Sequence, residues 1–350
     1  MGSASALALA RRGDRVTVLE RAVPGAEASS AAAGILGAQV EAHGPGAETD
    51  LFLASAALYP SFVAELLRET GIDVGYRRCG VIRVAGAGEE TALVEATSWQ
   101  ERAGLRVEQL DQAALHQAEP ALAEELTMGA RFGDDAQVDP PKLFRAVQIA
   151  ATRAGVTYRT GTQVRRVVVE QGRAVGVLLE DGSLVPADRV VLAAGSWSSL
   201  VDGIDLPRDA VQPARGQIVE LSLRIPPLRH VVFGRGAYLV PRDDGRVLVG
   251  STLELVGYTK EVTAAGVRDL LVAATRLCPL LEGAAFSGAW ASFRPFPKDG
   301  RLLLGTSSVK SLVYATGHHR NGILLAPLTA RVVAAACHDE PWSSPPEPPP

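Results

Sequence analysis

The sequence predicts an α/β fold in which a doubly wound domain is interrupted by insertions that carry an antiparallel sheet. Two observations support this prediction. Helical and strand patterns alternate at both ends of the chain, as they do in parallel α/β domains. The middle of the chain, about Val211 to Gly250, is instead rich in strand-like segments separated by turn residues. The chain has 350 residues, which allows one large or two medium domains.

The first elements follow one another closely. Residues 3–12 form a short Ala/Leu helix that Gly13-Asp14 ends, and residues 15–20 (RVTVLE) form a buried strand that ends in an acid. Residues 25–46 are small and rich in Gly, Ala and Ser. The sequence predicts further helices at 49–70, 89–103, 140–155, 264–277 and 322–338. Pro140 and Pro141 fit the first turn of the 140–155 helix, where no backbone N–H is needed.

Turn residues place several strands in the second half. Gln171-Gly172 joins 163–170 to 174–180 in a hairpin, and Asp181-Gly182 marks the next turn. The apolar strand 189–194 runs into Gly195-Ser196-Trp197-Ser198. Other predicted strands are 80–84, 302–304 and 312–315. Residues 343–350 form a Pro-rich tail that we expect to be disordered.

Bulk composition excludes several classes of partner. The net charge is −4, so the sequence predicts no nucleic-acid partner. It also predicts no overall positive field that would attract an anionic substrate. Cys79, Cys278 and Cys337 are far apart and match neither a metal spacing nor a disulfide framework, which favours a reducing cytoplasm and no metal. We find no apolar run of the ~18 residues that indicate a membrane span.

The N-terminal segment resembles part of a dinucleotide-binding unit. Such a unit needs a strand, a G-x-G-x-x-G turn, a helix, a second strand and an acid that binds the ribose. Gly2 can be the third glycine, and Glu20 follows it by 18 residues, close to the ~20 expected. The first strand and the first two glycines are missing, so Met1 could also simply start an Ala-rich helix. We expect the natural chain to be longer and this form to bind its cofactor weakly.

Four motifs then stand in a fixed order. They are Ser30-Ala31-Ala32-Ala33-Gly34-Ile35-Leu36-Gly37-Ala38; Ala237-Tyr238-Leu239-Val240-Pro241-Arg242 with Gly245-Arg246 and Val249-Gly250-Ser251-Thr252; Ser292-Phe293-Arg294-Pro295 with Lys298-Asp299-Gly300; and Gly317-His318-His319-Arg320-Asn321-Gly322-Ile323-Leu324-Leu325-Ala326-Pro327. In this order and spacing the chain resembles the FAD-dependent glycine oxidases of thiamine biosynthesis, within the D-amino-acid oxidase superfamily. The resemblance covers positions 2 to about 338.

The resemblance implies a split, Rossmann-like FAD-binding domain and a substrate domain built on an antiparallel sheet. The FAD domain would comprise residues 1–75, 139–205 and 298–340, and the substrate domain 76–138 and 206–297, with 341–350 as the tail. The cofactor would contact Gly2, Glu20, Arg21, Ser29, Ala33, Gly34, Ile35, Val164, Gly195, Gly317, His318, His319, Asn321, Gly322, Ile323 and Leu324. Glu20 would bind the adenosine ribose, Val164 would lie by the adenine, and 317–324 would follow the flavin ring.

The resemblance also implies which residues meet the substrate. Arg294 would hold the substrate carboxylate, because a guanidinium binds a carboxylate with two parallel hydrogen bonds. Tyr238 could donate its hydroxyl to the same group, and Arg320 would lie near substrate and flavin. Each has an ordinary structural alternative: an inter-domain bridge for Arg294, a half-buried strand tyrosine for Tyr238, and a surface arginine at a helix start for Arg320.

Other features carry weaker hypotheses. The helix expected from Gly322 could direct its positive end at the flavin. His318 and His319 suggest a base or a metal site, but a histidine pair without a third ligand rarely binds metal. Leu253 stands where some relatives carry methionine, and Trp197 suits packing better than substrate contact. No G-x-S-x-G nucleophile turn is present.

The expected activity is oxidation of glycine or a similar small amino acid or amine by hydride transfer to flavin N5. Molecular oxygen would take the electrons, giving an imine and hydrogen peroxide. Sarcosine, D-amino acids or D-proline remain alternative substrates, and an electron carrier an alternative acceptor. A second alternative is a non-catalytic protein that has lost its flavin. The sequence does not determine the oligomeric state; relatives are often tetramers, which leaves a homo-oligomer open.

Overall fold

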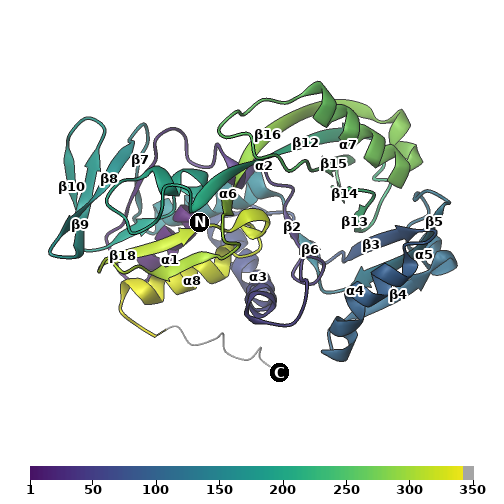
Figure 1. Cartoon of the computed structure of the whole chain (residues 1–350), viewed down its shortest axis with the longest axis horizontal. Coiled ribbons are helices and arrows are strands. Elements are labelled where there is room, and N and C mark those ends of the chain that lie inside the picture. Colours follow the sequence, from purple (N-terminus) through teal and green to yellow (C-terminus); the bar gives the residue numbers. More distant parts are fainter. Residues whose placement is uncertain (342–350) are drawn as a thin grey trace.

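The computed structural model describes residues 1–341, so the Pro-rich tail expected to be disordered lies outside the described residues. Figure 1 shows an elongated molecule with an α/β part at one end and a large sheet at the other. The chain crosses between these parts several times, and the N-terminus lies near the middle of the molecule. The mixed α/β architecture confirms the predicted fold class.

The α/β part joins segments that are far apart in the sequence. Strand β1 (Thr17–Leu19) pairs in parallel with β7 (Thr157–Arg159), and β11 (Val190–Leu192) pairs in parallel with β18 (Leu312–Thr316). Strand β17 (Leu303–Thr306) lies antiparallel to β18. Within residues 1–341, β1 and β11 each pair with a strand on one edge only.

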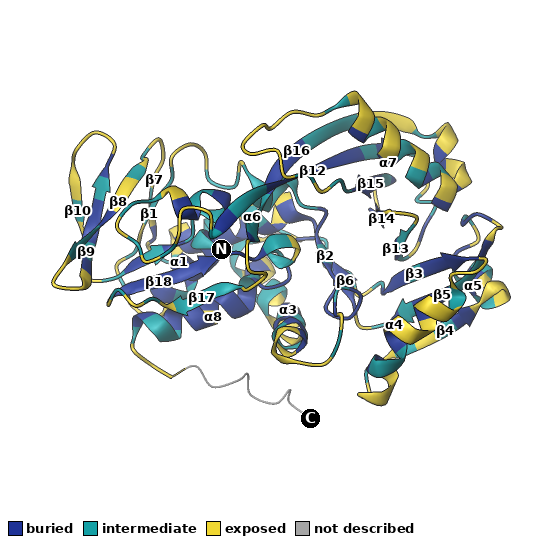
Figure 2. Ribbon diagram, in the orientation of Figure 1, coloured by how far each residue is buried: buried dark blue, intermediate teal, exposed yellow. Residues whose placement is uncertain are grey.

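Four helices build the core of this part. They are α1 (Gly2–Arg11), α3 (Ala47–Thr70), α6 (Pro140–Arg153) and α8 (Ala326–Cys337). Helix α1 packs against both α6 and α8, and α3 packs against the same two helices. Asp139 caps α6 by accepting a hydrogen bond from Lys142 N, which satisfies one backbone donor of its first turn. The small Ser and Ala side chains of α1 allow this close packing, and Figure 2 shows α8 as largely buried.

The predicted hairpin is confirmed and forms a separate small sheet. Strands β8 (Val164–Glu170) and β9 (Arg173–Leu179) are antiparallel, and β10 (Leu184–Pro186) adds to β9. Gln171 and Gly172 both have positive φ, as a tight two-residue turn requires. The outer strands of this sheet are largely exposed (Figure 2).

The large sheet has eight strands in the order β16-β12-β15-β14-β13-β3-β5-β4. Its strands are β3 (Val81–Gly86), β4 (Val107–Asp111), β5 (Leu126–Phe132), β12 (Val211–Ser222), β13 (Val231–Gly234), β14 (Ala237–Pro241), β15 (Arg246–Gly250) and β16 (Ala285–Pro297). Neighbouring strands are antiparallel except for β13 and β3. Helix α7 (Ala264–Leu277) packs on β12, β14 and β15, which leaves their opposite face for the site described below.

The remaining elements within residues 1–341 are helix α4 (Glu90–Arg102), which has 13 residues, and seven short segments. The short segments are α2 (Ala28–Ala31), α5 (Gln112–Ala118), β2 (Ile35–Leu36), β6 (Ala136–Gln137) and the 3₁₀ helices η1 (Gly195–Leu200), η2 (Pro279–Gly283) and η3 (His319–Asn321). The sequence analysis missed α2, α5, β2, β4, β5, β6, β7 and β16.

One predicted boundary was wrong. The final helix, expected from Gly322, begins at Ala326. Residues 322–325 form turns, and Pro327 stands in the first turn of the helix, where its missing N–H costs no hydrogen bond. The positive end of α8 therefore lies four residues further along the chain than expected.

Helix α3 is, within the described residues, long and apolar enough to cross a membrane by length and composition. The sequence analysis expected no such segment. One helix of this kind is weak evidence for a span, because core helices pass the same test. Here α3 buries Phe52, Tyr59 and Leu66 against the core it shares with α6 and α8.

Candidate cofactor and substrate site

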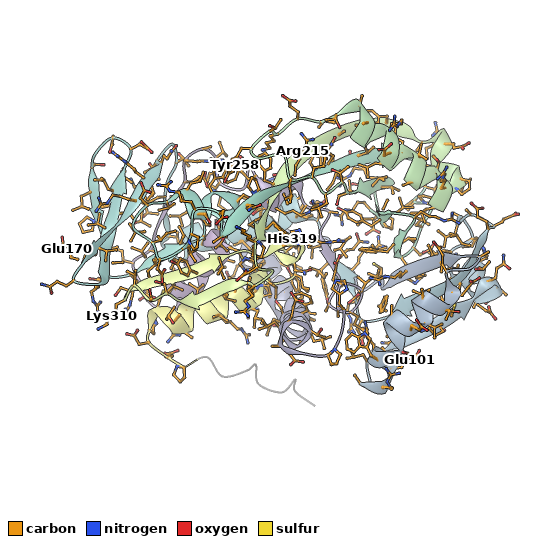
Figure 3. The ribbon with its side chains drawn as sticks, in the orientation of Figure 1. Glu101, Glu170, Arg215, Tyr258, Lys310 and His319 are labelled. Carbon is orange, nitrogen blue, oxygen red and sulfur yellow. The ribbon has the colours of Figure 1, made fainter. Side chains whose placement is uncertain are left out.

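A single cavity of about 1580 Å³ extends from the α/β part to the free face of the large sheet. Glu20 and Val164 line it in the α/β part, and Tyr238 and Arg294 line it at the sheet. His319 lies near the centre of the molecule, where these parts meet (Figure 3). The volume exceeds the 300–1,000 Å³ range typical of small-ligand pockets, as an extended ligand would require.

The N-terminus of α1 opens into this cavity. Residues 1–6 line it, and no side chain caps the helix, so its first backbone N–H groups lack an intrahelical acceptor. Ser5 Oγ is buried there without a hydrogen-bond partner in the protein. Unpaired N–H groups and the helix dipole together favour an anion such as a pyrophosphate.

The small-residue loop 31–35, at the end of α2, forms another wall, and two side chains that the sequence analysis gave no role hold it. Trp290 Nε1 donates to Ala31 O at 2.9 Å. Arg242 is buried and donates to Ala33 O at 2.6 Å and to Val138 O at 2.8 Å. Burial lowers the pKa of Arg242 to about 10, so it remains charged at neutral pH. Both residues hold in place a loop that is remote from them in the sequence.

At the other end, one face of the large sheet presents Tyr238 and Arg294. Tyr238 lies opposite Gly250 in the β14–β15 register, and Arg294 lies on β16 beside β12. A Cβ at Gly216 would stand 2.2 Å from Arg294 Nη1, and a Cβ at Gly250 would stand 2.3 Å from the Tyr238 hydroxyl oxygen. Only glycine at these two positions lets both side chains lie flat across the sheet and reach the cavity.

Backbone and hydroxyl groups orient the Arg294 guanidinium. Its Nη1 donates to Thr252 O at 3.1 Å, and its Nη2 donates to Ser251 Oγ. Burial lowers the pKa of Arg294, and the neighbouring Arg320 adds to this effect. Within residues 1–341, no acid lies in ion-pair contact with Arg294. Its charge is therefore open to an anionic ligand.

The two histidines have different surroundings. His318 is buried, and its Nε2 lies 2.9 Å from Thr329 Oγ1; burial lowers its pKa to about 3. His319 lines the cavity beside Phe296, with ring centroids 4.9 Å apart. Burial, then Arg294 and Arg320, lower the pKa of His319 to about 4. Its Nε2 is buried without a partner, so it can accept or donate one hydrogen bond to a ligand.

Near Glu20 the cavity is framed by aromatic and charged groups. The Arg21 guanidinium lies 3.7 Å from the centre of the Trp197 ring, which stacks on Tyr258. Glu20 Oε1 accepts a hydrogen bond from Ala22 N at 2.9 Å. Trp197 also lines the cavity, so it combines packing with a place in the wall.

Most predicted site residues line this one cavity. The cavity-lining set contains Gly2, Glu20, Arg21, Ser29, Ala33, Gly34, Ile35, Val164, Gly195, Tyr238, Arg294, His318, His319, Arg320, Asn321, Gly322 and Ile323. Gly317 and Leu324 are not in it, and Leu324 packs in the core. Leu253 is exposed and does not line the cavity either. The role assigned to each residue stays a prediction.

These features fit FAD. The cavity is long, an uncapped helix N-terminus opens into it, and Ser5 Oγ and His319 Nε2 are buried polar atoms without partners along its wall. The pyrophosphate would lie at Gly2 and Ser3, and the flavin ring between the 31–35 loop and His319. No side-chain hydrogen bond caps the helix N-terminus, so its backbone N–H groups can bind an anion there.

Comparison with known proteins agrees with this geometry. The DAO family of FAD dependent oxidoreductases matches residues 1–336. The chain is 36% identical to glycine oxidase of Geobacillus kaustophilus, over 95% of this chain and 89% of that protein. The crystal structure of that enzyme superposes with a TM-score of 0.92 at 34% identity, covering 98% of this chain and 93% of the other.

A second kind of relative is longer. The chain is 38% identical, over 95% of its length, to the bifunctional protein ThiO/ThiG of Trichormus variabilis. It covers 50% of that protein, so the chain spans about half the length of this relative.

Proposed function

Because the chain belongs to the DAO family of FAD dependent oxidoreductases, we propose that it oxidises glycine or a similar small amino acid to an imine. Molecular oxygen would be reduced to hydrogen peroxide. The observation that carries this proposal is the Arg294 guanidinium, which faces the cavity beside Tyr238 without an acidic partner in residues 1–341. In a substrate as small as glycine, the carboxylate is the one group that an arginine can bind strongly.

When bound, FAD supplies the hydride acceptor for the substrate Cα. The chain's own residues hold and orient the substrate. Arg294 donates two parallel hydrogen bonds to its carboxylate, and the Tyr238 hydroxyl adds a third. These hydrogen bonds fix the substrate Cα relative to the 31–35 loop and His319. Holding the reacting groups in one orientation lowers the entropic part of the activation barrier. His319 is neutral above about pH 4, so it is a hydrogen-bonding group and not a cation at neutral pH.

Glycine is favoured over sarcosine, D-proline and larger D-amino acids by the 36% identity to a glycine oxidase. Similarity to ThiO/ThiG supports a role in thiamine biosynthesis. Cys79, Cys278 and Cys337 are free thiols, which favours the cytoplasm. We further propose that residues 76–138 and 206–297, which contain all strands of the large sheet, form a substrate domain, and residues 1–75, 139–205 and 298–340 a FAD domain.

A panel of amines with a peroxide readout tests this proposal. Purified protein is reconstituted with FAD, and bound flavin is quantified by its absorbance. We expect glycine to give the highest kcat/KM. Absence of both peroxide formation and anaerobic flavin reduction with every small amino acid, at full flavin occupancy, would refute the substrate assignment. Absence of flavin binding would instead support the non-catalytic alternative.

A further inference from the structure

Two arginines line the substrate end of the cavity, and they differ in their partners. Arg294 forms no ion pair with an acid within residues 1–341, whereas Arg320 Nη2 lies 2.9 Å from Glu41 Oε1. Glu41 itself lines the cavity. Both guanidiniums line the cavity together with His319, and, in addition to burial, each lowers the pKa of that histidine. The site therefore holds two carboxylate-binding groups, one of which is already occupied.

The segment that carries Glu41 is firmly placed. The two carboxylate oxygens of buried Asp135 accept hydrogen bonds from Gln39 N and Val40 N, each at 2.9 Å. Gln100 Nε2 donates to Gln39 O at 2.9 Å. These hydrogen bonds anchor the backbone directly before Glu41. Only 15% of the Glu41 side chain is exposed, so this carboxylate is a constant part of the wall.

Arg320 retains free donors in spite of this pair. Its side chain is 45% exposed, and a guanidinium has five N–H groups, of which Glu41 takes one. A second carboxylate on a substrate could therefore reach Arg320, but it would also meet the negative charge of Glu41. Like charges at such distances disfavour binding.

We propose that Glu41 sets the substrate class by occupying Arg320, so that amines with one carboxylate are accepted and amines with two are rejected. This inference rests on the proposed function, since it takes Arg294 as the anchor of the first carboxylate. Glu41 acts through Arg320 and is a positioning and specificity residue. Its removal should release Arg320 for a second carboxylate.

The first test compares glycine with iminodiacetate, a secondary amine with two carboxylates. Glu41→Gln preserves the size of the side chain and removes its charge. We expect the ratio of kcat/KM for iminodiacetate to that for glycine to rise about fivefold, the upper end for partly exposed charge pairs. Glu48→Gln is the matched control, because Glu48 is exposed and does not line the cavity. The double variant Glu41→Gln/Arg320→Leu should lose the gain.

The second test measures binding without turnover. Diglycolate replaces the amine of iminodiacetate with an ether oxygen, and methoxyacetate lacks its second carboxylate. In titration calorimetry of the FAD-loaded protein, Glu41→Gln should tighten the binding of diglycolate about fivefold relative to that of methoxyacetate. If the wild type oxidised no amine but this shift appeared, the proposed function would fail and the specificity role would stand. Unchanged ratios in Glu41→Gln, or a gain that persists without Arg320, would overturn the inference.

Discussion

Replacing Arg294 with lysine separates the effect of charge from that of geometry. The guanidinium uses Nη1 to bind Thr252 O and Nη2 to bind Ser251 Oγ, which together hold its plane over Gly216. A lysine retains the positive charge, but its single ammonium cannot keep these hydrogen bonds and also present two parallel donors to a carboxylate. The substitution should therefore weaken substrate binding without removing the charge.

The size of the effect follows from the hydrogen bonds that a lysine cannot make. Removing one partner of a hydrogen-bonded charge pair in an interface costs roughly 2–5 kcal/mol. Because lysine keeps the charge, we expect a reduction toward the lower end, ~2.7 kcal/mol or about a hundredfold in kcat/KM. Most of it should appear in KM, since the carboxylate is bound in the ground state as well as in the transition state.

The assay combines steady-state peroxide formation with anaerobic flavin reduction by glycine. Arg301→Lys is the matched control, because Arg301 is exposed and does not line the cavity. Flavin content should be equal in both variants and the wild type. An unchanged kcat/KM in Arg294→Lys, at normal flavin content, would remove Arg294 from the substrate site.

Three further predictions follow from the same geometry. Gly216→Ala places a Cβ 2.2 Å from Arg294 Nη1, so the flexible guanidinium should move aside, raising KM for glycine about tenfold with little change in Tm. Trp290→Phe removes the hydrogen bond to Ala31 O, worth about 1 kcal/mol, and should raise the Kd for FAD about fivefold. The pKa of His319 is lowered to about 4, so it is already neutral throughout pH 5–8, and kcat/KM should show no inflection from it near pH 6.5.

Each of these has a control and a contrary outcome. Gly44→Ala adds a Cβ where no atom lies within 4 Å and should leave KM unchanged; an equal change in both glycine variants would contradict the steric argument. Trp99→Phe, on α4, removes an indole that does not line the cavity and should not alter FAD affinity. An inflection near pH 6.5 that disappears in His319→Asn would show that this histidine titrates in the working range.

Local patterns allowed much of the fold to be predicted. The helix at 49–70 and the hairpin across Gln171-Gly172 depend on periodicity and turn residues, and the structure has both. The last helix was predicted to begin at Gly322, but Gly322 lies in a stretch of turns. The helix begins at Ala326, and Pro327 is in its first turn. Strands β4 and β5 were missed, since each is stabilised by its neighbour in a sheet and not by a strong pattern of its own.

The substrate end of the site was only partly predictable. Tyr238, Arg294 and Arg320 stood in recognisable motifs, and all three line the cavity. Glu41, Trp290 and Arg242 went unrecognised. Trp290 binds a loop 259 positions away, and Arg242 binds one 209 positions away. No pattern of residue spacing within a short stretch of sequence indicates such a contact.

The class of fold, the order of its elements and the residue types able to hold a dinucleotide and a carboxylate can all be read from the chain without coordinates. Those properties depend on side-chain periodicity, turn chemistry and motif order, which act over a few residues. Three other properties needed the folded molecule: that Gly216 lies beneath Arg294, that Trp290 and Arg242 hold the 31–35 loop, and that Glu41 occupies Arg320. Such contacts arise only when distant segments pack together, because a side chain's partner is set by the path of the whole backbone.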